Sequence, residues 1–201
     1  MDDAAGEAFD KTAKHMGLGF PGGPKIEQLA KSGDPEAIKF PTPFKGQNHA
    51  NFSFAGLKTS VARAYDKSNG SHKAKADIAA SFQKTVCDIF HDRCTHAIKQ
   101  FKLEHPQKDL YFVVAGGVAA NKTIRAALTD LANKNGMKFL APPLKFCTDN
   151  AAMIALTGLE HFTDNPDRND INVNARPRWP LDPNAAKANP ASGSGKKGPK
   201  S

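Results

Sequence analysis

The feature that most constrains the fold of this 201-residue chain is a strand-like run that stops at two glycines. Residues 110–114 are continuously apolar, which predicts a strand buried on both faces. Gly116 and Gly117 follow, and residues 122–134 then carry apolar side chains at helical spacing. The segment therefore predicts a strand, a glycine turn and a helix. Such a turn either binds a nucleotide phosphate at the helix N-terminus or only redirects the chain.

The rest of the chain extends this pattern to an α/β lobe with a helical subdomain. Residues 137–140 form a second apolar run, so the two runs and the helix between them predict a βαβ unit with parallel strands and a right-handed crossover. Residues 52–54 alternate and predict a short strand. Helical periodicity covers residues 4–18, 25–31, 56–66, 74–102 and 151–162.

Composition places the fold in the first part of the chain. Periodicity ends after Thr163, and residues 183–201 are a low-complexity polar sequence that cannot bury a core. We expect residues 1–165 to form the lobe and residues 166–201 an extended or disordered tail. No apolar run reaches the roughly 20 residues that a membrane span needs. The start is also acidic where a signal peptide is basic, so a cytoplasmic protein with no membrane partner is expected.

Charge and cysteines give weaker indications of function. The net charge of +8 is typical either of a protein that binds a polyanion such as nucleic acid or of a basic solvated surface. Cys87, His91 and Cys94 share one face of a predicted helix. They are either metal ligands or a half-buried face with reduced thiols, and the lack of a fourth ligand nearby in sequence favours the thiols.

A second candidate site follows the second predicted strand. Thr148 is a candidate N-cap for the last predicted helix, and Asp149 would then be a first-turn carboxylate that stabilises the helix. The same loop lies at the carboxyl edge of the predicted parallel sheet, as does the turn at Gly116 and Gly117. Ligands of open α/β folds bind at that edge, so Asp149 is either a capping residue or part of a binding site.

Several stretches, in this order, closely resemble the TsaD family. They are DDAAGEAFDKTAK from Asp2, FPGGPKIEQLA from Phe20, NFSFAGLKT from Asn51, VVAGGVAANK from Val113 and CTDNAAMIA from Cys147. The family was formerly named O-sialoglycoprotein endopeptidase or glycoprotease. The resemblance implies the two-lobed ASKHA fold of actin, heat-shock ATPases and sugar kinases, of which this chain is similar to the second lobe.

The resemblance also implies an activity and a set of partners. The family transfers the threonylcarbamoyl group of threonylcarbamoyl-AMP to the adenosine next to the tRNA anticodon and releases AMP. Its implied partners are that adenylate, tRNA and the proteins TsaB and TsaE. The implied cofactor is one divalent metal ion, with iron first and magnesium or zinc as alternatives. The paired histidines of the family's first lobe are not found here, since His91 and His96 lie five positions apart.

Site residues carry over from the family by motif. The implied substrate-binding residues are Asp10, Gly23, Glu27 and Asn121, and Asp149 is the implied metal ligand. Carboxylates can accept from ribose hydroxyls, and an amide can both donate and accept.

Other functions stay open at this point. One is a non-catalytic lobe that binds an adenine nucleotide or a subunit, because the metal site would be incomplete. A sugar-kinase-like ATPase would share the fold. A metalloprotease is disfavoured, because no His-Glu-x-x-His helix occurs.

Overall fold

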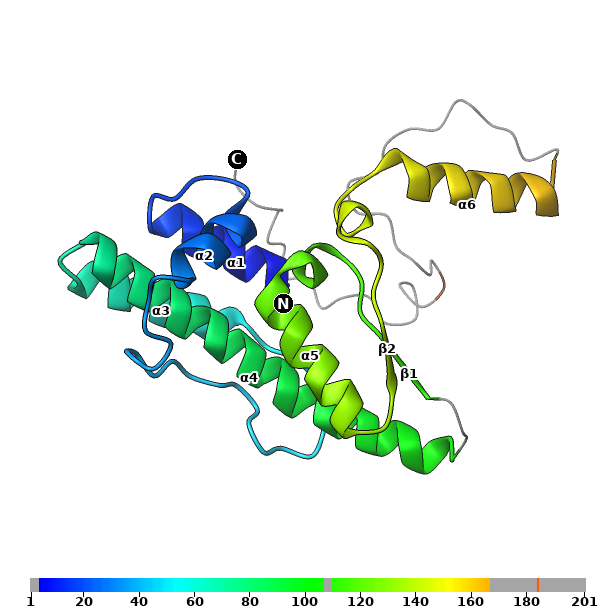
Figure 1. Ribbon diagram of the computed structural model, residues 1–201, viewed down its shortest axis with the longest axis horizontal. Helices are drawn as coiled ribbons and strands as arrows, with labels where there is room; N and C mark the ends of the chain where they lie inside the picture. Colours follow the sequence, from blue (N-terminus) through cyan, green and yellow to red (C-terminus); the bar gives the residue numbers. More distant parts are fainter. Residues whose placement is uncertain (1–3, 107–109, 167–183, 185–201) are drawn as a thin grey trace. The chain divides into compact units, whose positions relative to one another are not determined.

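The computed structural model describes residues 4–106, 110–166 and 184. The chain divides into two units, Met1–Ala151 and Ala152–Ser201. Figure 1 shows the described elements, which in the first unit are α1 (Ala5–His15), α2 (Gly22–Ala30), α3 (Ala55–Lys67), α4 (His72–Glu104), β1 (Tyr111–Val113), η1 (Gly117–Ala120), α5 (Lys122–Lys134), β2 (Lys138–Leu140) and η2 (Leu144–Phe146). The helix α6 (Ala151–Asp164) lies in the second unit except for its first residue.

The long helix α4 is the element on which the first unit is built. It contacts α2, α3 and α5, and Figure 1 shows α5 running beside it. Its apolar residues Ile78, Phe82, Val86 and Ile89 are almost completely buried, as their spacing predicts. The helix begins two residues before the predicted start, because the hydroxyl of Ser71 caps it by accepting from the backbone N–H of Ala74.

The helices α1 and α2 pack against each other and hold an aromatic contact to α4. Phe9 of α1 meets Phe82 edge-on, with ring centroids 4.9 Å apart. The prediction for α2 was wrong at its start, since the helix begins at Gly22 and not at Lys25. The paired glycines therefore form its first turn, because the Asp10 carboxylate accepts from the N–H of Gly22 at 2.7 Å and fixes that turn.

The predicted strand at residues 52–54 is not found, and those residues lead directly into α3. The rings of Phe52 and Phe54 stack at 6.2 Å with an interplanar angle of 8°. Both rings also contact Phe90 of α4. The alternating apolar residues thus pack against α4. Within the described residues no strand pairs with them, so they do not form part of a sheet.

The two strands form a small parallel sheet, as predicted. Tyr111, Phe112 and Val113 pair with Lys138, Phe139 and Leu140. Phe112 and Phe139 pack against the core, whereas Tyr111 and Val113 are 49% and 64% exposed. The predicted burial of β1 on both faces is therefore wrong for the described residues, because only the face that carries Phe112 packs against the core. The handedness of the crossover stays a prediction.

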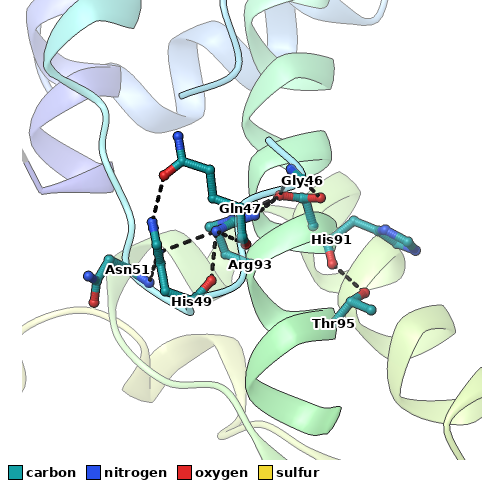
Figure 2. A network of polar contacts seen from close by, with 8 residues as sticks. Gly46, Gln47, His49, Asn51, His91, Arg93 and Thr95 are labelled. Carbon is teal, nitrogen blue, oxygen red and sulfur yellow. Dashed lines mark hydrogen bonds and ion pairs between the residues drawn. The ribbon is translucent and has the colours of Figure 1, made fainter. Parts of the chain in front are cut away.

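The segment between α2 and α3 is held to α4 by one buried arginine (Figure 2). Arg93 is fully buried and donates to the backbone carbonyls of Gln47 and His49 at 3.0 and 2.6 Å. It also forms an ion pair with Asp92, whose carboxylate accepts weakly from the N–H of Gly46. Burial alone would raise the pKa of Asp92, but the Arg93 guanidinium and the Gly46 N–H outweigh it and lower the pKa.

Two cysteines of α4 give the fold a pH dependence. Burial raises the pKa of the Cys87 and Cys94 thiols from 9.0 to about 11. Between these values the unfolded chain ionises the thiols while the folded chain keeps them neutral, so the free energy of unfolding should fall as the pH rises. Urea titrations at stepped pH should show this fall, and Cys87→Ala/Cys94→Ala should flatten it. An equal slope in the variant would contradict the assignment.

The remaining expectations concern the end of the chain and membranes. Most of the predicted tail, residues 166–201, lies outside the described residues. The described residues of α6 are exposed, including Ile154, Leu156 and Leu159. Among the described helices, none combines the length and apolar character that a membrane span requires.

Candidate functional site

A cavity of about 420 Å³ lies in the first unit between α1, α2 and the segment that leads into α5. Its walls are largely apolar, and its polar lining residues are Asp10, Glu27, Asn121 and Thr148. The four residues expected to bind substrate, Asp10, Gly23, Glu27 and Asn121, all line it although they are spread over more than a hundred positions of sequence. Size and lining are typical of a small-molecule site.

Asp10 uses one carboxylate oxygen to hold the wall of the cavity. Its Oδ1 accepts from the N–H of Gly22 at 2.7 Å, at the start of α2. Its Oδ2 has no partner among the described residues, and the side chain is half-buried at the cavity. A carboxylate in this position is a fixed acceptor that a hydroxyl or amine of a ligand can reach.

Glu27 and Asn121 each use one side-chain oxygen to hold the backbone, as Asp10 does. Glu27 Oε1 accepts from the N–H of Lys122 at 2.8 Å, and Asn121 Oδ1 accepts from the N–H of Ile124 at 3.0 Å. Both side chains thus cap the N-terminus of α5. The short helix η1 lies between the glycine turn and α5, and two α5 N–H groups already have protein partners. The N-terminus of α5 is therefore capped by side chains from α2 and from Asn121 itself, while Gly117 and Val118 of the turn line the cavity.

The paired glycines of α2 have different roles. A Cβ on Gly22 would lie 2.7 Å from Asp10 Cα and 2.8 Å from the Phe9 carbonyl oxygen, so only glycine allows α1 and α2 to approach this closely. A Cβ on Gly23 would meet nothing within 4 Å. Gly23 lines the cavity, so its missing side chain leaves room for a ligand.

This difference gives a matched pair of variants. Gly22→Ala should lower the free energy of unfolding by about 1–3 kcal/mol, because the new methyl group overlaps backbone atoms of α1. Gly23→Ala should leave stability unchanged or slightly higher, because its methyl group would meet no atom within 4 Å. Thermal unfolding of the two variants measures both effects. Equal destabilisation by both variants would contradict these roles.

Arg125 of α5 connects the cavity to the loop after β2. Its guanidinium donates to the carbonyls of Ala119 and Pro142 at 2.9 and 3.0 Å and lies 3.3 Å from Cys147 Sγ. Cys147 is buried, and its neighbour Thr148 lines the cavity. The expectation that Thr148 caps the last helix was wrong, because α6 begins only at Ala151. Arg125 instead fixes a loop that places Thr148 at the site.

The expected metal ligand Asp149 directly follows Thr148 but is not among the residues that line the cavity. Asp149 is exposed. Within the described part of the chain, no three His, Cys, Asp or Glu side chains are grouped closely enough to hold a metal ion. Cys87, His91 and Cys94 therefore do not form a metal site, and both cysteines carry free thiols. The described residues therefore do not form a complete metal site, and no catalytic step through a metal follows from them.

Comparison with known proteins places these motifs in one family. The profile of the family TsaD, described as tRNA N6-adenosine threonylcarbamoyltransferase, matches residues 1–156. The chain belongs to the TsaD family. The family assignment made from the sequence motifs is thereby confirmed.

Curated relatives of the TsaD family support the assignment over the whole chain. Proteins named tRNA N6-adenosine threonylcarbamoyltransferase from Maricaulis maris and Caulobacter vibrioides are 51% and 50% identical over all of it. One from Sphingopyxis alaskensis is 53% identical over 92% of it. The chain covers 54%, 54% and 51% of these three relatives, and so spans about half of their length.

Proposed function

We propose that the cavity binds the adenosine part of threonylcarbamoyl-AMP. The observation that carries this proposal is that the polar side chains at the cavity use one atom each to hold the backbone and leave other polar atoms for a ligand. Asp10, Glu27 and Asn121 each use one atom to hold the backbone, and each carboxylate keeps a second oxygen that has no partner among the described residues. Two fixed acceptors suit the two hydroxyls of a ribose. The apolar walls, including Phe9, Pro21 and Val118, suit the base.

The proposed reaction is the transfer named for the family. The exocyclic amine of the adenosine beside the tRNA anticodon would attack the carbamoyl carbon, and the bond from that carbon to the phosphate oxygen would break. AMP would leave, and the amine proton would pass to a base that the described residues do not identify. This chain would hold the leaving nucleotide in place during the transfer.

The architecture and partners of the whole enzyme belong to the same proposal. The α-helices and the parallel sheet are compatible with the second lobe of the ASKHA fold, and relatives twice as long would include the first lobe. The proposed partners are tRNA, TsaB and TsaE, and the proposed location is the cytoplasm. Asp149 would contribute one ligand to a metal completed elsewhere, with iron, magnesium or zinc as the ion.

Reconstitution tests the catalytic part of this proposal. The 201-residue chain would be combined with a polypeptide that carries the part of the Maricaulis maris relative that this chain does not cover. Threonylcarbamoyl-AMP and unmodified tRNA should then yield modified adenosine and AMP in equal amounts. ADP from ATP in their place would indicate a kinase-like ATPase. The Asp149→Ala chain should lose metal-dependent turnover in the mixture, and unchanged turnover would remove Asp149 from the site.

A non-catalytic nucleotide-binding lobe is the second candidate function. It is favoured by one observation: among the described residues, no three His, Cys, Asp or Glu side chains lie close enough together to hold a metal ion. This candidate predicts that the chain binds AMP and that the reconstituted mixture forms no modified tRNA. Turnover by the chain alone, above that of a heat-inactivated sample, would exclude it.

A further inference from the structure

The side-chain amide of Asn121 is held at the cavity from two sides. Its Oδ1 accepts from the N–H of Ile124 at 3.0 Å, which is the capping bond of α5. Its Nδ2 donates to Oε1 of Gln83 at 2.8 Å. The two bonds together decide which end of the amide carries the oxygen, because only Nδ2 can donate to Gln83.

Gln83 reaches Asn121 from the middle of α4, and it is buried to 6% exposure. Gln83 does not line the cavity. Its own amide is oriented by a third contact, since its Nε2 donates to the hydroxyl of Thr123 at 3.1 Å. A rotation of the Gln83 amide by 180° would bring its Nε2 against Asn121 Nδ2, donor to donor, whereas the Thr123 hydroxyl can accept or donate. The contact with Asn121 therefore fixes the orientation of the Gln83 amide.

We propose that Gln83 is a positioning residue that presents Asn121 to the nucleotide as a hydrogen-bond donor. Of the two hydrogens on Asn121 Nδ2, Gln83 takes one. The other has no partner among the described residues and is available to a ligand in the cavity. This inference rests on the proposed nucleotide site and adds a specificity to it: at Asn121 the ligand must offer an acceptor, such as a ring nitrogen or a sugar oxygen.

Two substitutions of Gln83 separate positioning from packing. Gln83→Glu keeps an oxygen that can accept from Asn121 and replaces the Nε2 donor with a second oxygen, to which the Thr123 hydroxyl can donate, at the cost of a buried carboxylate. Gln83→Met has a similar length and offers no comparable acceptor, so the Asn121 amide can turn and its Nδ2 loses its partner. A role in packing predicts that both variants behave alike in binding, whereas positioning predicts that the glutamate variant retains it.

Calorimetric titration of the 201-residue chain with AMP is the test. Gln83→Met should weaken binding about tenfold, the effect of one hydrogen bond of about 1.4 kcal/mol, while Gln83→Glu should stay within about threefold of the wild type. In the Asn121→Ala background Gln83→Met should cause no further loss, because the group it positions is gone. Thermal unfolding of each variant establishes that it is folded.

The outcomes distinguish this inference from the function on which it rests. No AMP binding by the folded wild type would overturn the proposed site, and this inference with it. Binding by the wild type with equal affinities in Gln83→Met and Gln83→Glu would overturn the inference alone, as would a full Gln83→Met effect in the Asn121→Ala background. If Gln83→Met does not fold, Gln83→Leu replaces it. If that variant also fails, the Asn121 side-chain amide signal in ¹⁵N spectra decides: its shift should persist in Gln83→Glu, and its displacement would overturn the inference.

Discussion

Arg93→Met is expected to lower the free energy of unfolding by about 3 kcal/mol. The guanidinium is completely buried and binds the Asp92 carboxylate and two carbonyls of the preceding loop. Methionine fills much of the same volume but leaves these acceptors without a donor. Desolvated acceptors that lose their partner cost more than an ordinary hydrogen bond contributes. Urea denaturation measures the loss.

Arg93→Lys is the matched control for this prediction. Lysine keeps the positive charge beside Asp92 but lacks the planar fork, which binds the Asp92 carboxylate through Nε and Nη2 while Nη1 donates to the carbonyls of Gln47 and His49. Its loss should fall between those of the wild type and the methionine variant. Hydrogen exchange of the backbone at residues 44–51 should accelerate in the same order. A methionine variant within about 0.5 kcal/mol of the wild type, the range of neutral surface changes, would show that Arg93 does not hold this loop.

Asp10→Asn is expected to weaken AMP binding by about tenfold to a hundredfold while leaving the fold intact. Asparagine keeps an oxygen that can accept from the N–H of Gly22, so the start of α2 should stay in place. The second position becomes an NH₂ group, which cannot accept from a ribose hydroxyl. The loss corresponds to a hydrogen bond with a charged partner, about 1.5–3 kcal/mol. Competitive titration against a fluorescent adenine nucleotide measures the affinities.

Asp10→Ala and Glu36→Gln are the controls. Asp10→Ala removes both acceptors, so it should lose binding and also stability, since the N–H of Gly22 loses its partner. Glu36→Gln makes the same loss of charge at an exposed carboxylate that does not line the cavity, and it should leave AMP binding unchanged. Equal weakening by Glu36→Gln and Asp10→Asn would mean that net charge, and not a contact at the cavity, sets the affinity.

Local pattern predicted the helices of this fold better than its strands. The spacing of Ile78, Phe82 and Val86 is enough to predict α4, because a helix buries one stripe whatever lies against it. The burial of β1 depends on what covers each face of the sheet, which five residues of sequence cannot show. The prediction of a strand at Phe52 and Phe54 was wrong for a similar reason. Two aromatic rings that pack against Phe90 can be spaced two residues apart, as the side chains on one face of a strand are.

The residues of the candidate site were also only partly predictable from the sequence. Motif resemblance gave Asp10, Glu27 and Asn121, and the structure places all three at one cavity. The sequence did not indicate a role for Gln83 or Arg125 at the site. Each is a polar residue within a helical pattern, and its partners lie far away in sequence. Only the packing of α4 against α5 reveals that Gln83 meets Asn121. Residues that orient a binding residue are therefore the ones that sequence alone misses.

The proposed nucleotide site is built by α1, α2 and the start of α5. Calorimetric titration of the 201-residue chain with AMP, for the wild type and for Asp10→Asn side by side, tests it most directly. The proposed site predicts saturable binding of one AMP per chain, weakened at least about tenfold by the substitution. A chain that circular dichroism shows to be folded and that releases no heat with AMP, or that binds it equally well with Asp10→Asn, would contradict the proposed site.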